Sequence, residues 1–82
     1  MTLGQFHAMM AEQNGRCAIC DQEFGVGRRL GPNVDHNHRT GKVRSLLCVG
    51  CNAGLGNFKE SIQVMRLAIN YLERKESDGK SL

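Results

Sequence analysis

Two Cys-x-x-Cys pairs enclose a short polar stretch whose residue types could carry out chemistry. The first pair is Cys17 and Cys20, and the second is Cys48 and Cys51. Two residues between the cysteines allow one tight turn to present both sulfur atoms to a tetrahedral ion. The doubled spacing therefore predicts a structural zinc site with four cysteine ligands. Two disulfides in a secreted chain are the alternative, which this spacing disfavours.

The stretch between the pairs is Asp35-His36-Asn37-His38, and Asn52 directly follows the second pair. Hydrolysis of a phosphodiester needs a base that deprotonates water, a divalent ion at the phosphate and cations that hold the substrate. A neutral imidazole suits the first task at physiological pH. Carboxylate and amide oxygens suit Mg²⁺, which prefers hard ligands. Asp35 and Asn52 are distant in the sequence, so we expect the zinc site to bring them together.

The elements that must position these residues form a small α+β domain. Thr2 is a plausible N-cap for the first helix, and Asn14-Gly15 ends it. Alternation in the second strand predicts Arg44 and Leu46 on one face and the odd-numbered residues on the other. In chain order we expect a helix over residues 3–14, a glycine-rich loop over 22–33, strands over 34–36 and 43–47, and a short helix from about residue 48 that Gly54 and Gly56 break.

The last expected element is a helix over about residues 58–75, with Asn57 and Glu60 forming a variant capping box. Its apolar residues recur at spacings of three and four, which makes one continuous stripe. This stripe favours a helix that packs on its own domain, and it is also wide enough to hold a second copy as a homodimer. The polar tail over residues 76–82 is expected to fray.

At 82 residues, the chain is expected to form one domain, with its core over about residues 15–57. A core of this size supplies at most ~3–5 kcal/mol, so a structural metal is the expected stabilising element. Met1 to Met10 lacks a basic start followed by an apolar run, so we expect no signal peptide, and no apolar run is long enough to span a bilayer. We therefore expect a soluble, cytoplasmic protein with no membrane partner.

The charge distribution favours a phosphate-bearing partner. The net charge is +3, and four thiolates around one divalent zinc would lower it to about +1. Between Gly15 and Lys59, however, the sequence contains seven cationic and only three anionic residues. Such an excess suits DNA, although solvated surface arginines are the alternative. The candidate phosphate contacts are Arg28, Arg29, Arg39, Lys42 and Arg44.

The motifs that carry a family resemblance lie in six segments, Gln13–Cys20, Val34–His38, Thr40–Arg44, Leu46–Cys48, Cys51–Asn52 and Leu55–Gly56. Taken together, they resemble the recombination endonuclease VII family, which belongs to the wider His-Me finger (ββα-metal, HNH-like) nucleases. The similarity covers roughly residues 5–72. It implies a zinc-stabilised ββα-metal core and a metal-dependent DNA endonuclease activity, with structural Zn²⁺ and catalytic Mg²⁺ or Mn²⁺.

The resemblance also implies a role for each site residue. The four cysteines would bind structural zinc, and Asp35 and Asn52 would hold the catalytic divalent ion. His36 would be the general base, its ring oriented by a hydrogen bond to a backbone carbonyl, and His38 would assist at the phosphate or the metal. The products would carry 5′-phosphate and 3′-hydroxyl ends. Some family members carry a glutamate where this chain has Leu55, which predicts fewer protein oxygens at the ion.

Two other readings use the same residues. A non-catalytic zinc module could bind nucleic acid or protein, but it has no need of a carboxylate beside the phosphate path. A second structural zinc site made of Asp35, His36 and His38 is chemically acceptable, but it leaves Asn52 unused. The endonuclease is therefore the favoured function, working either alone or beside a larger phage or bacterial assembly.

Overall fold

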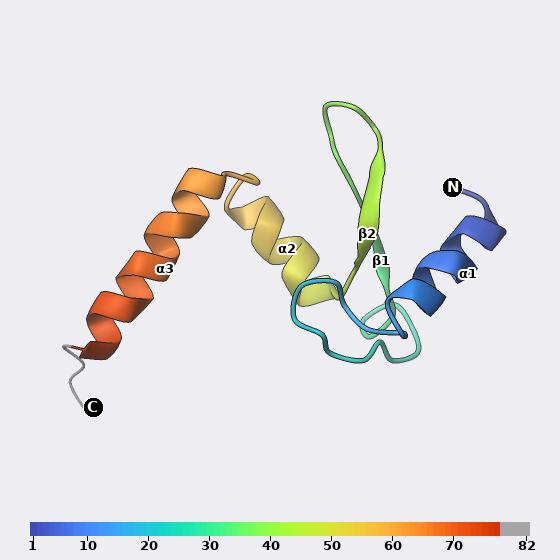
Figure 1. The fold of residues 1–82 in the computed structure, drawn as a ribbon, viewed down its shortest axis with the longest axis horizontal. Coiled ribbons are helices and arrows are strands. Elements are labelled where there is room, and N and C mark those ends of the chain that lie inside the picture. The colour runs from blue at the N-terminus through green and yellow to red at the C-terminus, as the bar shows by residue number, and fades with distance from the viewer. Residues whose placement is uncertain (78–82) are drawn as a thin grey trace.

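The computed structural model describes residues 1–77. An antiparallel hairpin lies between α1 and α2, and α3 extends away from the rest of the molecule (Figure 1). This arrangement confirms the predicted small α+β class, with an N-terminal helix and a longer C-terminal helix. The elements are α1 (Leu3–Glu12), β1 (Asn33–His36), β2 (Val43–Leu47), α2 (Val49–Asn57) and α3 (Ile62–Ser77).

Helix α1 begins at the predicted cap. The Thr2 hydroxyl accepts a hydrogen bond from the Gln5 amide at 3.1 Å, and the Gln5 side chain accepts one from the Thr2 amide at 2.8 Å. This reciprocal pair is a capping box. The helix ends at Glu12 rather than at Asn14, because Asn14 and Gly15 adopt positive φ angles of 55° and 66°. Left-handed residues of this kind end a helix.

The Gln13 side chain joins the end of α1 to the strand β2. Its Nε2 donates to the carbonyls of Arg16 at 2.7 Å and Leu46 at 2.9 Å, and its Oε1 accepts from the Leu46 amide at 2.9 Å. The amide group thus pairs with the β2 backbone as a neighbouring strand would. Leu46, which is 0% exposed, forms the centre of the core with Leu47 and Cys17.

We expect Gln13→Ala to lower the free energy of unfolding by about 1–3 kcal/mol, because it leaves the buried Leu46 amide unpaired. Chemical denaturation of the zinc-loaded protein measures this effect. Gln63→Ala, an identical change on exposed α3, is the control and is expected to change stability by less than about 0.5 kcal/mol. Equal denaturation midpoints for the two variants would contradict the role assigned to Gln13.

A register shift in the hairpin redirects one side chain. The shift falls between Asp35 and His36, and it leaves Arg44 without a partner on β1. A bulge of this kind bends the strand and re-aims its side chains. Arg44 consequently lies against Asp35, so the expectation of strict alternation along β2 is wrong at this position. The paired residues are Asn33–Leu47, Val34–Leu46, Asp35–Ser45 and His36–Val43.

Helix α2 continues through both of its later glycines. The Phe58 amide donates to the Gly54 carbonyl at 3.1 Å, and the Lys59 amide donates to the Gly56 carbonyl at 2.9 Å. The prediction that Gly54 and Gly56 break this helix is therefore wrong. The reason is that their backbone groups stay satisfied up to the C-cap at Phe58.

The predicted start of the last helix is also wrong. Asn57 is the final residue of α2, and Lys59 and Glu60 form a turn with positive φ angles of 52° and 55°. Ser61 instead caps α3, because its hydroxyl accepts a hydrogen bond from the Val64 amide at 3.1 Å. Since α3 runs to Ser77, the first two residues of the predicted tail are helical, and residues 78–82 lie outside the described part.

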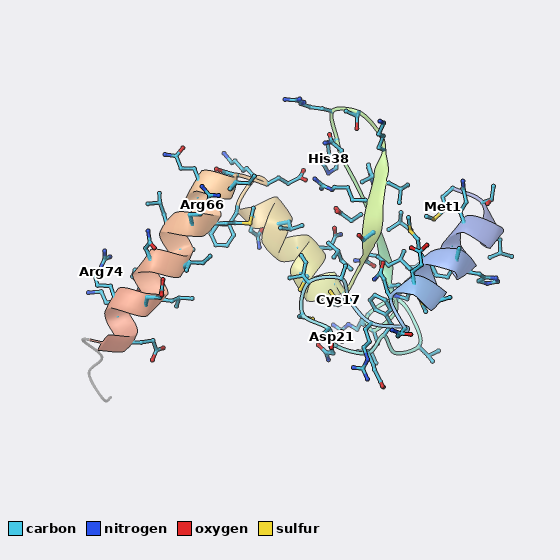
Figure 2. All side chains as sticks on the ribbon, in the orientation of Figure 1. Met1, Cys17, Asp21, His38, Arg66 and Arg74 are labelled. Carbon is cyan, nitrogen blue, oxygen red and sulfur yellow. The ribbon has the colours of Figure 1, made fainter. Side chains whose placement is uncertain are left out.

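Helix α3 makes no close contact with any other described helix or strand, and most of its residues are exposed, although Met65 and Ala68 are half-buried (Figure 2). Its apolar residues are mostly exposed, from 42% at Val64 to 66% at Ile62. The radius of gyration is 15.5 Å, against about 12 Å for a compact chain of this length. The expectation that the stripe packs on its own domain is therefore wrong, and pairing with a second copy stays a prediction.

None of the helices within residues 1–77 combines the length and the apolar composition needed to cross a bilayer.

Candidate functional site

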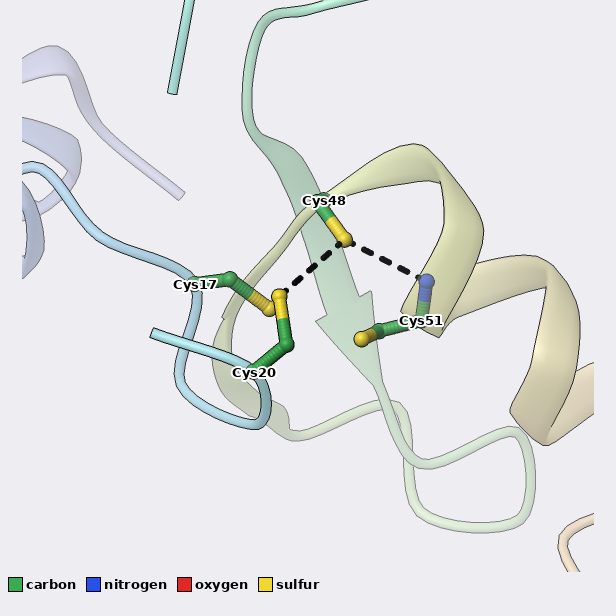
Figure 3. A group of neighbouring side chains, drawn as sticks. All are labelled: Cys17, Cys20, Cys48 and Cys51. Carbon is green, nitrogen blue, oxygen red and sulfur yellow. Dashed lines mark hydrogen bonds between the residues drawn. The ribbon is translucent and has the colours of Figure 1, made fainter. Parts of the chain in front are cut away.

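Four cysteine sulfurs converge where the first loop meets the start of α2 (Figure 3). The Sγ atoms of Cys17, Cys20, Cys48 and Cys51 all lie within 4.8 Å of one another, and those of Cys20 and Cys48 are 3.8 Å apart. A tetrahedral zinc with bonds of about 2.3 Å holds its sulfur ligands ~3.8 Å apart. The cluster therefore fits structural zinc. All four cysteines are free, which excludes the disulfide alternative in this structure.

Backbone amides orient two of these sulfurs. The Ile19 amide donates to the Cys17 sulfur at 3.4 Å, and the Cys51 amide donates to the Cys48 sulfur at 3.3 Å. Cys48 is also the N-cap of α2. Its sulfur therefore satisfies one of the backbone amides that a helix start leaves without a partner inside the helix. Cys48 thus serves both the metal cluster and the helix.

The thiols differ in their affinity for protons. Burial opposes ionisation of Cys17, but hydrogen bonds from the backbone of Cys20, Cys48 and Ile19 outweigh it and lower the pKa of Cys17 to about 6. Burial, together with the hydrogen bonds of the neighbouring Cys48, Cys17 and Cys20 side chains, raises the pKa of Cys51 to about 12. Zinc ligands must be thiolates. Zinc binding therefore releases protons from this cluster, above all from Cys51.

A second polar site lies between the hairpin and α2. Asp35 reaches it from β1 and is only 9% exposed, whereas Asn52 reaches it from α2. The structure thus brings together the two residues expected to hold a divalent ion. The site is a pocket of about 200 Å³ lined by Asp35, His38, Asn52, Leu55, Gly56 and Glu60.

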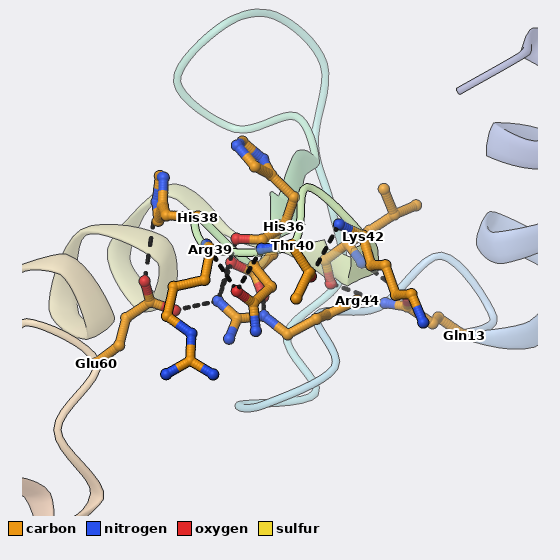
Figure 4. Close-up of polar contacts among 11 residues, drawn as sticks. Gln13, His36, His38, Arg39, Thr40, Lys42, Arg44 and Glu60 are labelled. Carbon is orange, nitrogen blue, oxygen red and sulfur yellow. Dashed lines mark hydrogen bonds and ion pairs between the residues drawn. The ribbon is translucent and has the colours of Figure 1, made fainter.

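Arg44 holds two carboxylates at the edge of this pocket (Figure 4). Its Nε donates to Asp35 Oδ2 at 2.7 Å, and its Nη2 donates to Asp35 Oδ1 at 3.1 Å. The same Nη2 donates to Glu60 Oε1 and, at 3.3 Å, to the His36 carbonyl. The hydrogen bond to Asp35, followed by that to Glu60, raises the pKa of Arg44 above its ordinary value. Arg44 is therefore a paired cation rather than a free one.

The two histidines occupy different positions relative to the pocket. His38 lines it, with Nε2 3.8 Å from Glu60 Oε2. His36 is exposed and does not line it, but the two imidazole rings lie 4.9 Å apart and are tilted by 54°. The His36 ring makes no hydrogen bond within residues 1–77, so the expected bond to a backbone carbonyl is absent.

The other predicted phosphate contacts are spread over three places. Arg39 lies at the hairpin tip close to Glu60, whereas Lys42 faces α1 near Gln5. Arg28 and Arg29 lie in the long loop, and Arg29 lines a hollow beside Cys48. Only Arg39 and Arg44 therefore adjoin the pocket.

Sequence reasoning missed Glu60 as a pocket residue because it assigned this residue to a helix cap. No local pattern marks it, since its position depends on α2 continuing to Asn57. Gln13 was missed as a structural link because its partner, Leu46, is 33 residues away.

Within residues 1–77, the four cysteines form the only cluster of thiol, imidazole or carboxylate groups arranged to hold a metal ion. Asp35, His36 and His38 do not form a second such cluster. This disfavours a second structural zinc site. A divalent ion in the pocket would also need the Asn52 amide and water, which hard ions such as Mg²⁺ accept readily.

Comparisons with known proteins identify relatives of this chain. The family model for recombination endonuclease VII matches residues 1–74. The Gene 59 protein of Mycobacterium phage D29 is 41% identical over 75 residues, which are 90% of this chain and 44% of that protein. The Gene 59 protein of Mycobacterium phage L5 is 48% identical over 61 residues, which are 73% of this chain and 36% of that protein. The chain thus spans less than half the length of these relatives, and it belongs to the recombination endonuclease VII family.

Proposed function

We propose that this chain is a metal-dependent DNA endonuclease that hydrolyses phosphodiester bonds. Membership of the endonuclease VII family and similarity to phage proteins support a nuclease or recombination-related role. The observation that carries the proposal is the pocket that joins Asp35 of β1 to Asn52 of α2. In this proposal, the hairpin and α2 correspond to the ββα-metal core of the His-Me finger nucleases.

The pocket's donor set suits a hard divalent cation such as Mg²⁺ or Mn²⁺. Asp35 offers carboxylate oxygens and Asn52 an amide oxygen. Each Asp35 oxygen uses one lone pair to accept a hydrogen bond from Arg44 and has a further lone pair for a metal. Leu55 contributes an apolar wall, so water would complete the coordination. When bound, the ion would stabilise the charge that develops on the leaving 3′-oxygen.

The histidines provide the proton chemistry in this proposal. The His36 imidazole accepts a proton from water as that water attacks the phosphorus atom, and the bond from phosphorus to the 3′-oxygen breaks. His38 lines the pocket and donates a hydrogen bond to the phosphate. The departing 3′-oxygen takes a proton from solvent, which leaves 5′-phosphate and 3′-hydroxyl ends. The exposure of His36 supports this role because it gives the ring access to water and to DNA.

Two features outside the pocket complete the proposal. Arg28, Arg29, Arg39 and Lys42 contact DNA phosphates from the hairpin and the long loop. The exposed apolar face of α3 pairs with a second copy, so that the active form is a homodimer. Sedimentation of the zinc-loaded chain tests the second feature, because a monomer at all concentrations would contradict it.

Plasmid nicking tests the proposed activity. We expect zinc-loaded protein to convert supercoiled plasmid to nicked circles with Mg²⁺ or Mn²⁺, and to leave it intact without a divalent ion. Asp35→Asn keeps the shape of the side chain but removes its charge, so we expect it to slow nicking by at least about 100-fold. Asp21→Asn, the same change beside the zinc cluster, is expected to cleave at the wild-type rate.

Two results would contradict the proposal. One is nicking at an equal rate without any divalent ion. The other is the absence of cleavage of plasmid, branched and single-stranded DNA by wild-type protein, which would leave the non-catalytic zinc module as the better reading. Exposure to chelator is kept brief in these assays, because prolonged chelation also strips structural zinc.

A further inference from the structure

A groove of about 380 Å³ adjoins the pocket, and the two share His38 and Glu60 as lining residues. The groove lies between the tip of the hairpin and the turn that connects α2 to α3. Figure 4 shows four of its residues, His38, Arg39, Arg44 and Glu60. Its lining residues are Asn37, His38, Arg39, Arg44, Lys59 and Glu60.

The groove contains two cations that have no counter-ion. Arg44 is paired with Asp35 and Glu60, whereas the side chains of Arg39 and Lys59 make no ion pair within residues 1–77. Arg39 comes from the hairpin tip and Lys59 from the turn after α2. With Arg44 and the Glu60 carboxylate included, the groove carries a net charge of +2 with neutral histidine. An anion in the groove therefore meets two free positive charges from separate segments.

Both segments are held in place by local hydrogen bonds. At the hairpin tip, Asn37 Oδ1 accepts from the Arg39 amide at 2.8 Å and from the Thr40 amide at 3.1 Å. In the other segment, the Lys59 amide donates to the Gly56 carbonyl at 2.9 Å. The backbone positions of Arg39 and Lys59 are therefore set by the fold before any ligand binds.

Lys59 also occupies an unusual backbone position. Its φ of 52° lies in the left-handed region, where glycine is favoured over residues with a Cβ atom. A lysine therefore costs stability at this position. Such a cost is typical of residues whose side chain has a function.

We propose that this groove binds the phosphate backbone of DNA beside the phosphate that enters the pocket, and that Lys59 is a contact to that backbone. The proposal rests on the endonuclease function, because binding of one phosphate in the pocket would set which part of the DNA strand lies in the groove. The Glu60 carboxylate on the groove wall would repel a phosphate, but Arg44 already pairs with it and offsets this charge. The expected ligand is thus a DNA strand that passes from the pocket to the hairpin tip.

Fluorescence anisotropy of a labelled DNA duplex tests the proposal. Zinc-loaded protein is used without a catalytic divalent ion, so that the DNA stays intact. We expect Lys59→Gln to weaken binding about three- to tenfold and to lower the slope of log Kd against log salt by about 0.9. Arg39→Gln is expected to act in the same way. Lys75→Gln removes an equal charge from α3 and is expected to bind like wild type.

Lys59→Gly is the control for an effect on folding. It relieves the strain of the left-handed backbone while removing the same charge. We expect it to melt no lower than wild type and to bind DNA as weakly as Lys59→Gln. In nicking assays, both variants are expected to raise KM and leave kcat near the wild-type value, because the lysine holds substrate away from the reacting atoms.

The outcomes separate this inference from the function on which it rests. Affinity and salt slope equal to wild type in both Lys59 variants would overturn the inference, even if wild-type protein cleaves DNA. Weaker binding by these variants combined with no cleavage by wild type would support the groove and overturn the nuclease. A wild-type protein that binds no DNA would overturn both.

Discussion

We expect the His36→Ala protein to lose nicking activity by about 10²–10⁴-fold, the usual contribution of a general base. The same protein is expected to keep its zinc and its unfolding temperature. The His36 side chain is exposed and makes no hydrogen bond within residues 1–77, so its removal leaves no buried group unpaired. Plasmid nicking, zinc stoichiometry and circular dichroism together measure this combination.

His7→Ala is the matched control for this experiment. His7 lies on exposed α1, where its ring is 6.0 Å from that of Phe6, and we expect the variant to cleave at the wild-type rate. Loss of helical signal in His36→Ala would show that this residue is structural and would refute its catalytic assignment. Because His38 lines the pocket, His38→Ala is measured alongside. Full activity in His36→Ala with none in His38→Ala would transfer the role of base to His38.

The second large effect is expected from Cys48→Ser, which we predict to unfold residues 1–57. Structural zinc contributes roughly 10 kcal/mol or more of apparent binding free energy. The buried apolar core consists of Cys17, Leu46 and Leu47, which cannot replace a term of that size. Serine is itself a good N-cap, so the capping role of Cys48 survives the change. Unfolding of Cys48→Ser would therefore result from the loss of a zinc ligand and not from the loss of a helix cap.

Thermal melts with zinc analysis check this prediction. Val49→Ser, at the adjacent exposed position of α2, keeps all four sulfurs and is expected to melt cooperatively with one bound zinc. Wild-type protein stripped of zinc is expected to unfold and to recover when zinc is returned. A cooperative melt of Cys48→Ser, or of stripped wild type, would contradict the view that zinc holds the domain together.

Local interactions made part of the fold predictable. The Thr2 N-cap and the strand over Val43–Leu47 were both predicted, because each depends on residues close together in the chain. The cysteine cluster was predictable for a related reason, since the spacing inside each pair restricts how the two sulfurs can point. Where two local signals competed, prediction failed. Ser61, rather than Asn57, caps α3 because backbone hydrogen bonds carry α2 as far as Asn57.

The contents of the pocket depended on contacts between distant segments. The residue types for ion binding and proton transfer were evident from the sequence, but the direction of Arg44 was not. That direction follows from a one-residue register shift in the hairpin, which brings the guanidinium onto Asp35. Glu60 and Lys59 likewise enter the site through a left-handed turn whose position is set by the end of α2.

The sequence by itself determined the residue types of the site, the cysteine cluster and the succession of helices and strands, because each of these depends on residues close together in the chain. Only the tertiary structure decided that His38 rather than His36 lines the pocket and that Arg44 is paired with Asp35. It also decided that the apolar face of α3 is exposed. These features arise from packing between segments far apart in the chain, which no local pattern encodes.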